Sequence, residues 1–108
     1  MKFIVDRSRW LRGNRESDSM LLNSRGHMCC LGFVGEQCGI TKDEMLGRAL
    51  PSSITEPEIR SKYPSWLLGE NEMYCANFND SSVISDDERE AGLIEIFNHQ
   101  GDELEFVG

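Results

Sequence analysis

The residues best suited to chemistry lie in a short segment near the start of the chain. This segment places a tryptophan among three arginines, namely Arg7, Arg9, Trp10 and Arg12. Guanidinium groups bind phosphates and carboxylates through paired hydrogen bonds, and they stack on aromatic rings. The segment therefore fits a clamp for an anionic nucleotide or for an aromatic side chain of a partner. The pattern favours the alternative, in which Trp10 and Leu11 pack under a sheet while the arginines are solvated or form salt bridges.

A second feature is the separation of charge along the chain. The net charge is −8, but residues 1–62 sum to +2, whereas residues 63–108 carry one basic side chain against eleven acidic ones. A negative surface repels a phosphate backbone, so we expect no direct binding of nucleic acid. The acidic part is interpreted as a solvated surface, as a docking surface for a basic protein, or as the internal partner of the N-terminal arginines. The residues assigned to the docking surface are Asp80, Asp86, Asp87 and Glu90.

The chain also contains four cysteines, Cys29, Cys30, Cys38 and Cys75. A catalytic thiol could take His27 or His99 as its base, but no cysteine-protease signature surrounds these residues. A zinc site is a weak interpretation because the chain has no C-x-x-C pair. Cysteine is among the most frequently buried residue types. We therefore expect structural cysteines, no metal and no cofactor.

Helix starts are marked by a repeated pattern. Thr41, Thr55 and Ser85 each precede a glutamate by three positions, which is the spacing of a capping box. The third box opens the strongest predicted helix, residues 86–100, and Gly101 follows it as a stop. The polar residues 77–82 are predicted to form a turn before this helix, with a binding loop as the alternative.

The strand predictions define the fold class. Residues 2–6, 19–23 and 103–107 are rich in β-formers or alternate in polarity, which predicts strands. Apolar spacings of three and four predict a buried helix over 28–38, whose two glycines would let another backbone approach closely. We expect one α+β domain over residues 1–108, with a small sheet that pairs the N- and C-terminal strands and three or four helices that cover it.

Several short motifs together carry a family resemblance. They are W-L-R-G at 10–13, M-C-C-L-G-F at 28–33, C-G-I at 38–40, S-D-D-E-R-E at 85–90 and L-E-F-V at 104–107. With these motifs the chain resembles a family of small accessory proteins encoded by tailed bacteriophages and prophages. The resemblance implies a protein of the bacterial host cytoplasm and supplies no catalytic motif.

These observations favour a non-enzymatic function. We expect a protein that binds and inhibits a host or anti-phage defence protein with a basic surface, through its own acidic surface. The alternative is a protein that binds or sequesters a nucleotide with the N-terminal arginines and tryptophan, and a thiol enzyme ranks third. No apolar run approaches the roughly 20 residues that a membrane span needs, so we expect no membrane partner. The small core that a chain of this length can form leaves a homodimer open.

Overall fold

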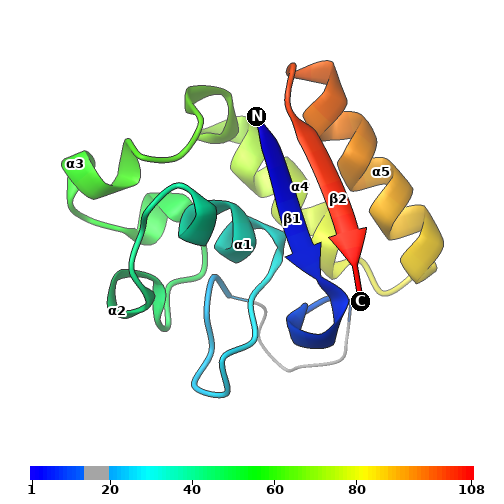
Figure 1. The fold of residues 1–108 in the computed structure, drawn as a ribbon, viewed down its shortest axis with the longest axis horizontal. Helices are drawn as coiled ribbons and strands as arrows, with labels where there is room; N and C mark the ends of the chain where they lie inside the picture. Colours follow the sequence, from blue (N-terminus) through cyan, green and yellow to red (C-terminus); the bar gives the residue numbers. More distant parts are fainter. Residues whose placement is uncertain (14–19) are drawn as a thin grey trace.

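The two terminal strands lie side by side in the computed structural model, which describes residues 1–13 and 20–108 (Figure 1). Strand β1 (Lys2–Asp6) and strand β2 (Glu103–Val107) pair in parallel along their whole length. Both strands were predicted at these residues, and their pairing confirms the expected terminal sheet and the α+β class. The rest of the chain therefore forms one long crossover between two adjacent strands.

This crossover consists of helices. In chain order they are η1 (Arg7–Arg9), α1 (Cys30–Gln37), α2 (Lys42–Met45), η2 (Pro51–Ser53), α3 (Pro57–Arg60), η3 (Ser65–Leu67), α4 (Glu70–Asp80) and α5 (Asp86–His99). The longer helices carry the core. Helix α1 packs against β1, α5 packs against β2, and α4 contacts both α1 and α5 behind the sheet (Figure 1).

The sheet buries one face and exposes the other. Phe3 and Val5 of β1 are fully buried, and Leu104 and Phe106 of β2 are almost fully buried on the same face. This period of two follows from the pleat, which sends successive side chains to opposite sides of a strand. The Phe3 ring meets the Phe97 ring of α5 edge to face, with centroids 6.0 Å apart. Burial of each such side chain contributes about 1.5–3 kcal/mol to folding, so the two terminal strands are held mainly by α5 and the core.

A side chain closes the outer edge of β1. The Ile4 amide donates to Oε1 of Gln37 at 2.8 Å, and Gln37 Nε2 donates to the Ile4 carbonyl at 2.7 Å. The primary amide of Gln37 thus imitates a neighbouring strand. Unpaired backbone groups at a sheet edge invite pairing with another chain, so this contact protects β1.

The predicted strand over 19–23 is not observed. Ser19 lies outside the described residues, and residues 20–23 form only an isolated bridge between Leu22 and Leu46. The physical reason is that Leu21 and Leu22 are both buried, so the segment does not alternate between a wet and a dry face. It crosses α1 instead, where a Cβ on Gly32 would collide with the Leu21 carbonyl oxygen.

The capping boxes are confirmed at two of the predicted positions. Thr41 and Ser85 each accept from the backbone N–H three residues later and receive the reciprocal glutamate contact. The box predicted at Thr55 is wrong, because α3 begins at Pro57 with Glu56 as its N-cap. Proline is favoured at the first helical position, and this preference moves the helix start one residue past the predicted one.

Helix α4 was not predicted, and it replaces most of the turn expected over 77–82. Unlike an ordinary amphipathic helix, α4 buries polar side chains and exposes an aromatic one. Glu72 and Asn79 are buried, whereas Tyr74 is 62% exposed. The turn itself is shorter and follows α4, over residues 81–85.

Candidate functional site

The N-terminal arginines and the start of α5 meet in space. Arg7 donates Nε to Glu90 Oε2 at 2.8 Å and Nη2 to Oε1 at 2.7 Å, which is a two-point ion pair. Arg12 Nε lies 3.3 Å from Asp86 Oδ2. The basic and the acidic candidate residues therefore form one internally paired cluster. Internal pairing of the N-terminal arginines was the interpretation that the sequence favoured.

Trp10 lies inside this cluster and is 4% exposed. Its indole Nε1 donates to Asn79 Oδ1 at 2.8 Å. One side of the ring packs on Phe106 with centroids 4.7 Å apart, and the Arg12 guanidinium lies 4.7 Å from the ring centroid. The ring is thus occupied by contacts within the chain, as expected for a tryptophan that packs under the sheet.

Asn79 holds the cluster together, a role that its place in a polar run of the sequence does not indicate. Its Oδ1 accepts from Trp10 Nε1 and from the Cys30 amide at 3.2 Å, while Nδ2 donates to the Leu11 carbonyl at 2.9 Å. Because Asn79 is fully buried, each of these polar groups would lose its partner if the side chain were removed. The fully buried asparagine joins α4, α1 and the N-terminal segment.

The guanidinium of Arg89 closes the C-terminal end of α4. It is 3% exposed and donates Nη1 to the Asn79 carbonyl at 3.0 Å and to the Ser81 carbonyl at 2.6 Å. Nη2 donates to the Ile84 carbonyl at 3.1 Å. The last carbonyls of a helix have no partner within the helix, so Arg89 acts as the cap of α4.

The remaining candidate residues lie at the margin of the cluster. Arg9 lies 3.6 Å from Asp6 and has its guanidinium 5.4 Å from the Phe33 ring centroid. Asp80 accepts from Asn79 Nδ2 at 2.8 Å. The hydrogen-bonded Glu90 carboxylate raises the pKa of Arg7, and the exposed Asp87 adds a smaller effect in the same direction.

The ion pairs of the N-terminal arginines argue against the hypothesis that these arginines bind a nucleotide. Each of Arg7, Arg9 and Arg12 has an acidic partner within the chain. A phosphate that approached them would have to displace a carboxylate that is already held.

The cysteines are mostly buried. Burial raises the pKa of Cys29 to about 12 and that of Cys75 to about 12. Only the thiolate is nucleophilic, so these thiols are inert at neutral pH. The same effect raises the pKa of Cys30, and Cys38, which is half-buried, has a raised pKa as well. Among the described residues, no group of three or more histidine, cysteine or acidic side chains is arranged to hold a metal ion.

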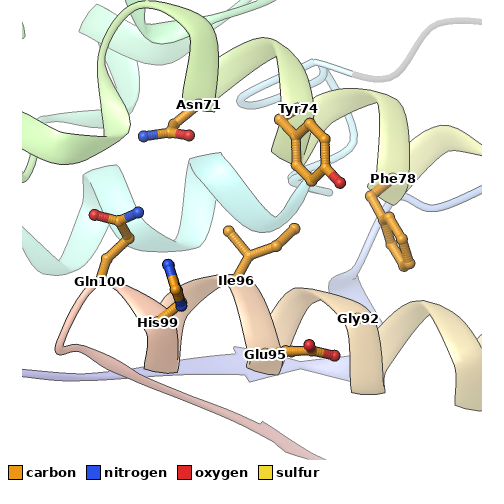
Figure 2. Close-up of a pocket in the computed structure, with 8 residues that line it drawn as sticks. All are labelled: Asn71, Tyr74, Phe78, Gly92, Glu95, Ile96, His99 and Gln100. Atoms are coloured by element: carbon orange, nitrogen blue, oxygen red, sulfur yellow. The ribbon is translucent and has the colours of Figure 1, made fainter.

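The site that the sequence did not reveal is a groove between α4 and α5 (Figure 2). It is an open hollow of about 370 Å³, lined by Asn71, Tyr74, Phe78, Gly92, Glu95, Ile96, His99 and Gln100. A second hollow of about 310 Å³ adjoins it, since Tyr74 and Phe78 also line that one together with Asn77, Ser81 and Ile84. We call the first of these hollows, which lies between the two helices, the α4–α5 groove.

One glycine makes the groove possible. A Cβ at Gly92 would collide with the Phe78 ring, so the absence of a side chain there lets the ring lie directly on α5. Tyr74 stands one helical turn before Phe78 on the same face of α4. The i, i+4 spacing of two aromatic residues was the one signal in the sequence that could have indicated this face.

The groove combines apolar and polar groups. In Figure 2 the Tyr74 ring extends from α4 toward α5, and the Glu95 side chain extends from α5 below the Tyr74 and Phe78 rings. The amide of Asn71 is held at one end, where Nδ2 donates to the Trp66 carbonyl at 2.6 Å. An exposed aromatic surface with a few fixed polar groups is the usual composition of a binding site.

Comparison with known proteins gives no relative. No family model, no curated protein and no solved structure matches the chain. The resemblance to phage accessory proteins therefore stays a prediction. Along the described residues, no helix has both the length and the apolar character needed to cross a membrane.

Proposed function

We propose that the protein is a non-enzymatic binding protein and that its partner is a protein with a basic surface, which docks on the α4–α5 groove. The observation that supports this most is the exposure of Tyr74, at 62%, beside a hollow of about 370 Å³. Tyrosine is enriched among the residues that dominate protein interfaces, because it buries a large ring at low entropic cost.

The charge around the groove supports a basic partner. Glu95 lines the groove, and the exposed residues Glu70 and Asp87 lie on the same two helices. The one basic residue of 63–108 is Arg89, which is buried against the end of α4. Among the described residues, neither lysine nor arginine lines the groove. Complementary charge speeds association and selects among partners.

The identity of the partner is proposed from the sequence. The phage resemblance points to a host or defence protein in the bacterial cytoplasm. Because Asp86 and Glu90 are paired with arginines of the same chain, we assign the acidic docking surface to Glu95 and the groove. Inhibition would follow from occupation of the partner's basic site.

The test is capture of the partner by tagged protein from bacterial lysate at low and at high salt. Tyr74→Ala removes an exposed ring from the groove, and Leu46→Ala removes an exposed side chain of 50% exposure that does not line it. We expect a stoichiometric basic protein that is retained by wild type and Leu46→Ala at low salt, and lost with Tyr74→Ala or at high salt. Equal capture by wild type and Tyr74→Ala, or no partner at either salt, contradicts the proposal.

A further inference from the structure

We infer that the corner of the groove formed by Tyr74, Phe78 and Glu95 receives an arginine side chain of the partner. This inference rests on the proposed function and adds to it the chemistry of recognition. The three side chains come from both helices and surround one space, with the two rings on the α4 side and the carboxylate on the α5 side (Figure 2).

The chemistry of the corner selects a planar cation. An aromatic face attracts a cation through the ring quadrupole, and a carboxylate adds a direct charge. Arginine satisfies both at once, because its flat guanidinium stacks on a ring while its N–H groups form paired hydrogen bonds to a carboxylate. The lysine ammonium is a compact and strongly hydrated charge, which makes it a poorer match for two rings.

The protein already binds one of its own arginines in this way. The Arg12 guanidinium lies 4.7 Å from the Trp10 ring centroid, and its Nε is 3.3 Å from Asp86. That cluster contains the same two kinds of group as the corner, namely an aromatic ring and a carboxylate of α5. The carboxylate is Asp86 in the cluster and Glu95 in the corner. In the corner Tyr74 and Glu95 are exposed to solvent and Phe78 is half-buried, and no arginine among the described residues lines it.

The remaining groove accommodates the residues that flank the arginine. Ile96 offers an aliphatic surface beside the corner, and the amides of Asn71 and Gln100 lie farther along the groove (Figure 2). An extended or helical segment with an arginine next to a leucine or isoleucine therefore fits the site. An anionic ligand does not fit, because the groove presents the Glu95 carboxylate and no lysine or arginine of residues 1–13 and 20–108 lines it.

The test uses a blocked pentapeptide, Gly-Leu-Arg-Leu-Gly, and a counterpart in which citrulline replaces arginine. Citrulline keeps the shape of the side chain and removes its charge. By isothermal titration calorimetry we expect the citrulline peptide to bind about tenfold more weakly, since hydrogen bonds to charged groups are the stronger ones. Equal affinity for the two peptides, or no binding of the arginine peptide, overturns the inference.

Variants of the corner locate the binding. We expect Glu95→Gln to weaken binding of the arginine peptide about tenfold, and Tyr74→Leu to weaken it about threefold. Glu58→Gln, which removes an exposed carboxylate of α3 outside the groove, is the matched control and should leave the affinity unchanged. An unchanged affinity of Glu95→Gln contradicts the assigned corner.

The inference and the proposed function fail in different ways. If Tyr74→Ala abolishes capture of the lysate partner while neither peptide binds, the groove is a protein-binding site that does not recognise arginine. If Tyr74→Ala captures the partner as wild type does, the proposed function itself is wrong. Circular dichroism of each variant verifies that the fold is intact, which is expected because Tyr74 is 62% exposed and Glu95 is also exposed.

Discussion

Helix α5 carries two arrangements of the same chemical groups. Near its start, Asp86 and Glu90 are paired with Arg12 and Arg7, and the adjoining indole of Trp10 is buried. Farther along, Glu95 stands beside the exposed ring of Tyr74, and no arginine in the part of the chain that the structure describes lines that site. We call the first arrangement the internal cluster, and the second is the α4–α5 groove.

The two arrangements differ in whether their polar and charged groups already have partners within the chain. In the internal cluster each cation has its carboxylate and the indole N–H has its acceptor on Asn79, so its residues contribute to stability. In the groove, removal of a side chain leaves few buried groups without a partner. The same residue types should therefore determine folding in one region and recognition in the other, and matched substitutions can separate these effects.

The largest expected difference is between the two aromatic residues. Trp10→Ala removes a buried ring and leaves Asn79 Oδ1 without one of its donors, so it should lower the free energy of unfolding by about 4 kcal/mol. Tyr74→Ala removes a ring that is 62% exposed and should change it by no more than about 0.5–1 kcal/mol. Urea denaturation followed by circular dichroism measures both. Similar losses for the two variants would remove the distinction between the regions.

The second prediction concerns the contact between Gly92 and the Phe78 ring. Gly92→Ala places a methyl group where the Phe78 ring lies, and we expect a loss of about 2 kcal/mol together with a loss of partner capture. In the Phe78→Ala background the methyl group has space, so the same substitution should have little effect on stability. A double-mutant cycle by urea denaturation measures this coupling. Additive effects would show that Gly92 is not required by the ring.

Glu90 and Glu95 of α5 provide a matched pair of charges. Glu90→Gln weakens the ion pair with Arg7, whose side chain is 39% exposed, whereas the Glu90 side chain is 15% exposed. Because solvent screens such a pair, we expect a loss of about 1 kcal/mol that shrinks in high salt. Glu95→Gln should leave stability unchanged and weaken partner capture. The opposite assignment of effects, with capture lost in Glu90→Gln, would place the docking surface at the internal cluster.

The smallest effect concerns pH. Asp6 accepts hydrogen bonds from the Ser8 hydroxyl and amide, and these hold the pKa of its carboxyl below the usual value. A lowered pKa in the folded state adds stability above the unfolded pKa, about 3.9 for aspartate, and this stability is lost as pH falls through the folded pKa. The urea midpoint of wild type should therefore fall more between about pH 5 and pH 2 than that of Asp6→Asn. Parallel curves for the two proteins would contradict this.

The sequence predicted the elements whose signals are local. The terminal strands, the boxes at Thr41 and Ser85 and the glycine after α5 depend on residues within a few positions of each other. Internal pairing of the arginines was also expected, although the individual partners were not. Opposite charges separated by about 80 residues can be matched as groups, but the fold decides which of them meet.

Helix α4 and its groove could not be predicted in this way. The buried side of α4 includes Glu72 and Asn79 beside Cys75, and its exposed side includes Met73 and Tyr74. No apolar period in the sequence therefore marks the side of α4 that faces the core. The groove further requires Phe78 to pack on Gly92, a contact between two helices that neither helix shows in its own sequence. Both features depend on tertiary packing, which here overrides the local pattern.

We propose that the groove, and not the internal cluster, accepts the arginine of a partner. NMR titration of the isotope-labelled protein with the peptide Gly-Leu-Arg-Leu-Gly distinguishes the two regions, because amide shifts map the contact residue by residue. We expect shifts over residues 71–78 and 92–100, with residues 7–12 and 86–90 unaffected. Shifts confined to residues 7–12 and 86–90 would contradict it.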